Sequence, residues 1–202
     1  MSADADDDIE VLRIETLSAD RYPLRRYRFS QRRGDGTRAT LERQLYELGE
    51  SVAVLPIDRS RGTVLLVRQL RLAAYLAGDP PALIEACAGH LETGDSPADA
   101  ARREAAEELG YELRGLQPLF TLYMSPGLIT ERIHFFVAEY DAAMARGAGG
   151  GLEAEGEDIA IIETTIADAW RMVERGEIID AKTVLLLQHA RLTLPADVEQ
   201  TS

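Results

Sequence analysis

The order of polar and apolar residues in the first half of the chain is typical of β-strands. Apolar, β-branched and aromatic residues gather in short runs, and glycine, proline and aspartate separate these runs at turns. Two of the runs are separated only by the turn-forming residues 58–62, so we expect them to pair as a hairpin. The segments predicted to be extended are 9–15, 22–29, 40–48, 51–57, 63–70 and 83–88.

One helix stands out after these strands. Ser96 can cap its N-terminus, Pro97 suits the first helical position, and Asp99 adds an acidic group to the first turn. Gly110 supplies a stop at the C-terminus. Small apolar residues recur between these ends at helical spacing, which predicts close packing against a sheet: Ala98, Ala101, Ala105 and Leu109.

The second half of the chain alternates strands with helices. Strands are expected at 116–123, 133–140 and 159–163, and helices at 166–175 and 181–192. Residues 142–156 are rich in glycine, alanine and glutamate and are predicted to form a long loop, which at this length is usually functional or disordered. The glycine run within that loop lacks the strand, lysine and helix of a phosphate-binding loop.

Composition places the chain among globular proteins. Of its 202 residues, 46% are hydrophobic, which is enough for a sizeable core, and no apolar run is long enough to span a bilayer. The single cysteine, Cys87, excludes an intramolecular disulfide, and its apolar surroundings favour a buried side chain over a nucleophile. We therefore expect a soluble cytoplasmic protein that binds no membrane.

The net charge restricts the class of ligand. The chain carries 35 acidic against 22 basic residues, a formal charge of −13, which argues against nucleic-acid binding. Such a surface also repels phosphorylated substrates. A site that holds metal cations would reverse the local sign, so an anionic substrate is compatible with the composition if metal is bound.

The candidate chemistry lies on the helix 96–109. Glu104 and Glu108 are four residues apart and share one face, and their repulsion would be relieved by a divalent cation such as Mg²⁺. Arg103 can pair with Glu107 across one turn and so fix the carboxylates. Glutamates on a helix more often form a solvated face. The preceding strand, glycine, loop and cap favour the metal site instead.

Residues 89–111, GHLETGDSPADAARREAAEELGY, resemble the Nudix box, G-x5-E-x7-R-E-U-x-E-E-x-G-U with U apolar. Two positions depart from that pattern, because Asp95 replaces a glutamate and Ala105 replaces a larger aliphatic residue. Neither change touches the paired glutamates. The positions in register are Gly89, Arg103, Glu104, Glu107, Glu108, Gly110 and Tyr111.

The resemblance extends beyond the box and covers most of residues 22–187, more loosely before Ser51. The segments 122–127 (LYMSPG) and 130–136 (TERIHFF) look like the GDP-mannose pyrophosphatase branch of the family, which is close to the ADP-ribose pyrophosphatases. Four further segments share this likeness: 149–151, 157–159, 176–178 and 182–187.

The resemblance implies a set of metal ligands. In that family the cluster uses the backbone carbonyl before the box glycine, two box glutamates and one glutamate of a late loop. Mg²⁺ is the expected cation, with Mn²⁺ as an alternative. Glu153 and Glu155 are alternatives for the late-loop ligand, although the Glu-Asp-Ile context favours Glu157. The implied ligands are Ala88, Glu104, Glu108 and Glu157.

The resemblance also implies residues that act on the substrate. Glu131 resembles the general base that activates the attacking water, and the alternative interpretation is a solvated loop residue without a catalytic role. Arg103 and Glu107 are expected to support the catalytic glutamates. Lys182 matches a substrate contact, with a surface lysine as the equal alternative. The full set matched to substrate binding is Arg71, Ala88, Gly89, His90, Glu131, Glu157 and Lys182.

Two further positions, Tyr22 and Arg43, match residues that the partner subunit contributes in a family dimer. The sequence around Arg43 departs from the family pattern, which leaves the preferred base and sugar open. Neither His90 nor His134 is assigned a catalytic role.

The leading hypothesis is therefore an α/β Nudix fold, with a mixed sheet between helices. Residues 1–50 would form a small β region used for homodimerisation, and residues 51–202 the Nudix hydrolase domain. It would cleave a nucleoside diphosphate sugar, with GDP-mannose preferred, to nucleoside monophosphate and sugar 1-phosphate. Alternatives are an ADP-ribose pyrophosphatase, a catalytically silent nucleotide-sugar-binding domain, and an enzyme that hydrolyses modified nucleoside triphosphates.

Overall fold

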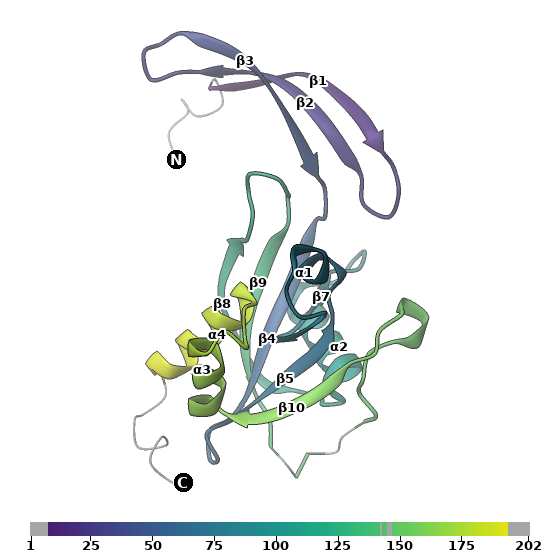
Figure 1. Cartoon of the computed structure of the whole chain (residues 1–202), viewed down its shortest axis with the longest axis vertical. Coiled ribbons are helices and arrows are strands. Elements are labelled where there is room, and N and C mark those ends of the chain that lie inside the picture. The colour runs from purple at the N-terminus through teal and green to yellow at the C-terminus, as the bar shows by residue number, and fades with distance from the viewer. Residues whose placement is uncertain (1–7, 142, 145–146, 194–202) are drawn as a thin grey trace. The chain divides into compact units, whose positions relative to one another are not determined.

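The computed structural model describes residues 8–141, 143–144 and 147–193, and the chain divides into two compact units across this described part (Figure 1). Unit 1 contains the residues up to Gly49 together with Tyr123–Arg132. Unit 2 contains Glu50–Leu122 and the residues from Ile133 onward. The chain therefore passes between the units at 49/50, at 122/123 and at 132/133.

Unit 1 is an antiparallel sheet of three strands within residues 8–49, in the order β1, β2, β3. The strands are β1 (Ile9–Ser18), β2 (Leu24–Arg32) and β3 (Arg38–Tyr46). The segment Tyr123–Arg132 joins this sheet through backbone bonds. The Tyr46 N–H donates to the Leu128 carbonyl at 2.9 Å, and the Thr130 N–H donates to the Tyr46 carbonyl at 3.1 Å.

Unit 2 is built on a sheet that has seven strands in the described part of the chain. Its main order is β10, β5, β4, β9, β8, with β6 beside β5 and β7 beside β4. The predicted hairpin is confirmed, because β4 and β5 pair antiparallel at Ile57 and Val64. The strands are β4 (Glu50–Asp58), β5 (Thr63–Leu70), β6 (Ala82–Glu85), β7 (Cys87–His90), β8 (Arg114–Tyr123), β9 (Arg132–Glu139) and β10 (Ala160–Thr165).

Helices cover this sheet on both sides (Figure 1). Every residue of β4 from Ser51 to Asp58 is buried, and because successive strand residues point to opposite faces, both faces must be covered. On one face, the small residues of α2 (Pro97–Glu104) and of its continuation η2 (Ala105–Leu109) pack with Val52 and Val54. The helix α4 (Ala181–Thr193) also contacts β4, and α3 (Ile166–Glu174) contacts β10. The expected α/β class is confirmed.

Three local predictions were incomplete. The single strand expected at 83–88 is two strands, because the N–H of Ala86 leaves the sheet and donates to Thr183 Oγ1 at 2.7 Å. The helix α1 (Leu72–Ala77) was missed, since six residues show no clear period and no side chain caps its start. The predicted helix 96–109 is continuous, but its last turn, Ala105–Leu109, is π-helical.

The expected long loop 142–156 contains a short 3-10 turn, η3 (Glu153–Glu155), while residues 142, 145 and 146 and the side chain of Glu155 lie outside the described residues. Across the described residues, no helix combines the length and the apolar character needed to cross a membrane.

Candidate metal and phosphate site

The box helix begins as its sequence predicts. Ser96 is extended, its Oγ accepts the Asp99 N–H at 3.2 Å, and Pro97 occupies the first turn. Ala101, Ala105 and Leu109 are fully buried against the sheet. This packing fixes the face of the helix that carries Glu104 and Glu108.

Glycines hold the other end of this helix to the late loop. The N–H of Gly150 donates to the Glu108 carbonyl at 2.8 Å, and the N–H of Gly151 donates to the Glu107 carbonyl at 3.1 Å. Gly149 has a φ of +59°, and a Cβ there would lie 2.9 Å from the backbone of Leu109. The glycine run 149–151 therefore lets the loop approach closely and satisfies carbonyls at the helix end.

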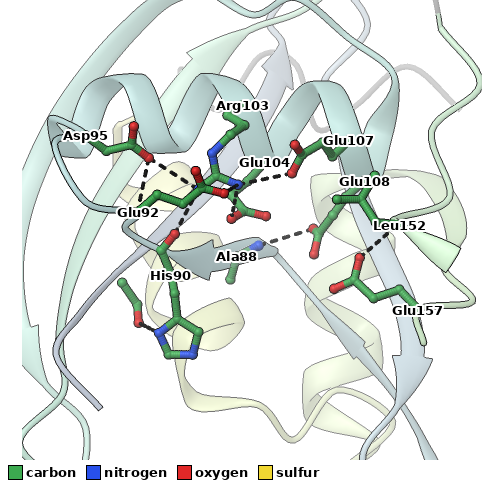
Figure 2. A network of polar contacts seen from close by, with 11 residues as sticks. Ala88, His90, Glu92, Asp95, Arg103, Glu104, Glu107, Glu108, Leu152 and Glu157 are labelled. Carbon is green, nitrogen blue, oxygen red and sulfur yellow. Dashed lines mark hydrogen bonds and ion pairs between the residues drawn. The ribbon is translucent and has the colours of Figure 1, made fainter. Parts of the chain in front are cut away.

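Three carboxylates gather beside this helix end (Figure 2). Glu104 and Glu108 extend from the helix toward Ala88, and Glu157 lies beyond them on the late loop. The Glu104 carboxylate rests on Gly89 so closely that a Cβ on that glycine would lie 2.0 Å from it. Glu108 is 1% exposed and accepts the N–H of Ala88 at 3.2 Å.

Burial and repulsion favour the protonated forms of Glu104 and Glu108. Burial raises the pKa of Glu104 to about 7, repulsion by Glu107 and Glu157 adds to the rise, and Arg103 opposes it. Burial raises the pKa of Glu108 to about 8, and repulsion by Glu104 and Glu157 acts in the same direction. A bound cation would favour the ionised forms of both groups.

Arg103 connects the carboxylates with the strand-to-helix loop. Its guanidinium donates to Glu104 at 2.9 Å, to Glu107 at 3.1 Å and to the backbone carbonyl of His90 at 2.9 Å. The predicted pairing of Arg103 with Glu107 is therefore present. Asp95 lies 3.4 Å from Arg103, so this shorter substitute for the family glutamate still reaches the arginine.

A second charged cluster lies at the start of α4. Arg71 donates from Nε and Nη2 to the two oxygens of Glu85, both at 2.8 Å. Lys182 lies 2.6 Å from Asp180 and 3.7 Å from Glu85. The negative charge of Glu108 also acts on Arg71, so the two clusters are electrostatically coupled.

Comparison with known proteins identifies the family. The model of the NUDIX domain matches residues 47–193. The chain belongs to the NUDIX family. A GDP-mannose pyrophosphatase of Cronobacter sakazakii is 42% identical over 185 residues, which cover 91% of this chain and 95% of that protein. Proteins of the same name from Pectobacterium atrosepticum and Escherichia coli are 41% and 40% identical, over 90% and 92% of this chain and 93% and 96% of theirs.

The same fold occurs in a solved structure described as an ADP compounds hydrolase. It superposes with a TM-score of 0.68 and covers 92% of this chain and 93% of that one, at 21% sequence identity. The expected Nudix architecture is thus confirmed by the family match and by this structure.

The NUDIX carboxylates fit a hard divalent cation. Glu104, Glu108 and Glu157 offer oxygen donors from the helix and the late loop, which are the ligands that such a cation prefers. Burial, together with repulsion from neighbouring carboxylates, raises the pKa of Glu104 and of Glu108, and a cation would offset both effects. Within the described residues, however, no three or more Asp, Glu, His or Cys side chains are already placed closely enough to hold a metal ion. Glu157 accepts the Leu152 N–H at 3.0 Å through one of its two oxygens.

Three of the residues predicted to act on the substrate, Glu131, Tyr22 and Arg43, belong to unit 1, whereas the carboxylate cluster belongs to unit 2. Glu131 is half-buried in the segment between β8 and β9, and Tyr22 stacks edge-on with Tyr46 at 6.1 Å. Arg43 donates to the carbonyl of its neighbour Glu42 at 2.7 Å. Their roles toward the substrate stay predictions.

Sequence reasoning missed Glu85 and Asp180. Glu85 lies in the apolar run Leu83–Ala88, which reads as a core strand, and nothing in the run indicates a partner. Asp180 precedes α4 and accepts the N–H of Thr183 at 2.9 Å, a helix-capping position that local sequence could have indicated. His90 Nδ1 lies 3.0 Å from Ser51 Oγ, in line with a structural role for its ring.

Proposed function

We propose that this NUDIX protein hydrolyses the diphosphate of a nucleoside diphosphate sugar, with GDP-mannose preferred. The oxygen of water forms a bond to one phosphorus, the bond between that phosphorus and the bridging oxygen breaks, and the products are a nucleoside monophosphate and a sugar 1-phosphate. Relatives named GDP-mannose pyrophosphatase, about 40% identical over nine-tenths of the chain, support this substrate. The carboxylate cluster of Glu104, Glu108 and Glu157 carries the assignment of the chemistry.

Mg²⁺ is the proposed cation, with Mn²⁺ as an alternative, and Ala88, Glu104, Glu108 and Glu157 would hold it. When bound, the metal would supply Lewis-acid polarisation of the phosphoryl oxygens and offset negative charge. Arg103 orients Glu104 and Glu107 through the bonds described above. In this proposal Arg71 and Lys182 bind phosphate oxygens, and Gly89 and His90 line the substrate.

Glu131 is the proposed base that accepts the proton of the attacking water. It lies in the segment between β8 and β9, where the N–H groups of its neighbours Thr130 and Arg132 donate to the carbonyls of Tyr46 and Gly49. Tyr22 and Arg43 are proposed to reach the active site of a partner subunit. The cytoplasmic location remains a prediction.

The proposed homodimer has support in unit 1. Strand β1 exposes Ile9 (58%), Val11 (53%) and Ile14 (51%) in the single chain, a set of apolar side chains that a second copy could cover. Light scattering during size-exclusion chromatography should give twice the 22.2 kDa mass of the chain. A mass of one chain at micromolar concentration would contradict the dimer.

A substrate panel tests the proposed reaction. GDP-mannose, ADP-ribose, other nucleotide sugars and nucleoside triphosphates are each incubated with Mg²⁺, and products are separated by chromatography. We expect the highest kcat/KM for GDP-mannose, with GMP and mannose 1-phosphate as products. A higher kcat/KM for ADP-ribose would make ADP-ribose the preferred substrate in place of GDP-mannose. Activity on nucleoside triphosphates alone, with release of pyrophosphate, would contradict the assignment to nucleotide-sugar hydrolases.

Substitution of the cluster tests the metal assignment. Glu104→Gln and Glu108→Gln keep side-chain volume and remove charge, so each should lower kcat by 10²-fold or more, on the scale of other electrostatic catalytic groups. Glu139→Gln, on the exposed end of β9, is the matched control and should keep wild-type turnover. Near wild-type activity in both box variants would exclude the site. Tight binding of nucleotide sugars by the wild-type protein, with no product formed in Mg²⁺ or Mn²⁺, would indicate a binding domain.

A further inference from the structure

Glu85 is a buried carboxylate that the proposed reaction does not use. It ends β6, follows the apolar residues Leu83 and Ile84, and is only 2% exposed. An ion pair of this kind is weak evidence for stability, because the cost of desolvating both charges offsets much of their attraction. Its position between two cations that are proposed to bind substrate suggests a different role.

The contact with Arg71 fixes a flexible side chain. Both guanidinium donors on one edge, Nε and Nη2, bond to the two Glu85 oxygens at 2.8 Å, a bidentate pair with strong directional preference. Nη1 takes no part in these bonds, and the Arg71 side chain is 40% exposed while Glu85 is buried. The carboxylate thus anchors one edge of the guanidinium and leaves another edge for an anion.

The contact with Lys182 extends this arrangement. Glu85 lies 3.7 Å from the ammonium, which Asp180 holds at 2.6 Å. Asp180 is itself fixed because it accepts the hydroxyl of Thr183 at 2.7 Å and the N–H of Thr183 at 2.9 Å. Thr183 Oγ1 also accepts the Ala86 N–H, which ties the break after β6 to the start of α4.

We propose that Glu85 is a positioning residue that holds Arg71, and with it Lys182, in place for the phosphates of the substrate. This inference rests on the proposed function, in which both cations are substrate ligands. Glu85 contributes by reducing the conformational freedom that Arg71 would otherwise lose on binding. It touches neither the substrate nor the reacting atoms.

Kinetics of Glu85→Gln test this role. Glutamine keeps the shape but loses the charge and one acceptor, so Arg71 should be held less well in the free enzyme. We expect KM for GDP-mannose to rise about tenfold, the equivalent of ~1.4 kcal/mol, with kcat within about twofold of wild type. An unchanged KM in folded Glu85→Gln would overturn the proposal.

A double-mutant cycle separates positioning from a general structural effect. In an Arg71→Ala background, Glu85→Gln should raise KM by less than about twofold, because the residue that it positions is gone. A full tenfold rise in that background would also overturn the proposal. If Glu85→Gln does not fold, Glu85→Asp carries the same test, with a smaller rise in KM that again depends on Arg71.

Asp58 provides the matched control. It is also a buried carboxylate, 5% exposed, and its Oδ2 accepts Arg61 Nε at 2.6 Å in the turn between β4 and β5. Asp58→Asn should lower the melting temperature without a change in KM. A tenfold rise in KM in this control would show that loss of any buried ion pair produces the effect.

An NMR measurement separates this proposal from the function on which it rests. In metal-free protein without substrate, the Nε–Hε signal of Arg71 should be protected from solvent exchange in the wild type and lose protection in Glu85→Gln. Loss of turnover on every nucleotide sugar, with this protection intact, would contradict the function alone. Equal exchange in the two proteins would contradict the positioning role.

Discussion

At Gly89, one added methyl group should lower activity and leave the stability of the fold almost unchanged. Its φ is not in the left-handed region, so alanine is compatible with the backbone. A Cβ there would nevertheless lie 2.0 Å from the Glu104 carboxylate, which is the far end of a flexible side chain and can rotate away by giving up its bond to Arg103. The contact is therefore relieved by moving a proposed metal ligand and not by moving the fold.

Gly89→Ala should accordingly change the free energy of unfolding by less than about 1 kcal/mol, while kcat with Mg²⁺ falls at least 10-fold because a displaced catalytic group loses its geometry. Thermal unfolding and steady-state kinetics measure the two effects. Gly34→Ala, where a Cβ meets nothing within 4 Å, is the control and should change neither. Full activity in Gly89→Ala would show that the position of Glu104 is unimportant.

The raised pKa values of Glu104, about 7, and Glu108, about 8, predict how stability depends on pH. Unfolded glutamates ionise near pH 4.3, so between that pH and about 8 the folded chain holds protons that the unfolded chain has lost. Stability from these groups is complete below about pH 4.3 and is lost progressively as pH rises from there through 7 and 8. Asp58, whose pKa is lowered to about 2, acts only below this window.

The melting temperature of the protein in EDTA should therefore fall between pH 5 and pH 8.5, and Mg²⁺ should recover most of the loss at the upper end, because it favours the ionised carboxylates. A variant with both Glu104→Gln and Glu108→Gln should show a flatter profile and little response to Mg²⁺. A melting temperature that rises with pH over this range in EDTA would contradict the prediction.

Part of the site could be predicted because the residues that interact there are close to one another in the sequence. Glu104 and Glu108 share a helix face by spacing, and Arg103 reaches Glu107 across one turn. Glu85 could not be predicted in this way. Its partners, Arg71 and Lys182, lie 14 and 97 positions away, and only the tertiary structure places them around it.

Among the elements, the link between the late loop and the helix end is the most sensitive to substitution. The glycine run 149–151 has φ values of +59°, +96° and +81°, and its N–H groups bond to carbonyls of Glu107 and Glu108. This link fixes the segment that leads to Glu157. Loss of the link should thus affect both stability and metal binding.

Gly149→Ala should destabilise the fold by ~1–3 kcal/mol, because alanine is strained at positive φ and its Cβ would meet the backbone of Leu109. The Mg²⁺ concentration for half-maximal activity should rise as well, since the loop moves away from the helix. Gly156→Ala is matched in φ, at +73°, but its Cβ meets nothing within 4 Å. Equal losses of stability and of Mg²⁺ affinity in both variants would show that strain at positive φ alone causes them.

The boundaries of an element were predictable where the hydrophobic pattern and the turn residues agree, as in the hairpin of β4 and β5. They were less predictable where a residue distant in the sequence determines where the element ends. The break between β6 and β7 depends on Thr183, which takes the Ala86 N–H, and no local signal marks it. The π-helical turn is equally hidden, because the sequence AAEEL suits an α-helix as well.

At the scale of the whole molecule, the division into units does not follow the sequence. The sequence suggested an N-terminal region of residues 1–50, yet Tyr123–Arg132 belongs with unit 1 and follows Leu122 of unit 2. Its backbone bonds to Tyr46 and Gly49 are long-range contacts that no local pattern reports. The predicted dimerisation role of this region stays a prediction.

Removal of residues 1–49 should expose this segment to proteolysis. The Arg132 N–H donates to the Gly49 carbonyl at 3.1 Å, and Thr130 donates to Tyr46, so the truncated chain loses both partners. Trypsin should cleave after Arg132 at least several-fold faster in residues 50–202 than in the full chain. Cleavage after Arg175, between α3 and α4, is the internal control, and equal rates at Arg132 in both chains would contradict the prediction.

The π-helical turn Ala105–Leu109 makes the spacing of the box as important as its residues. The turn accommodates one more residue than a regular helix would between the same two ends. Deletion of Ala106 would keep every glutamate and arginine of the box, yet it would shorten this turn toward a regular helix and so change how Glu107 and Glu108 lie relative to Arg103 and Glu104. Substitution of a residue within this turn therefore changes one side chain, whereas deletion of a residue changes the spacing of the whole carboxylate cluster.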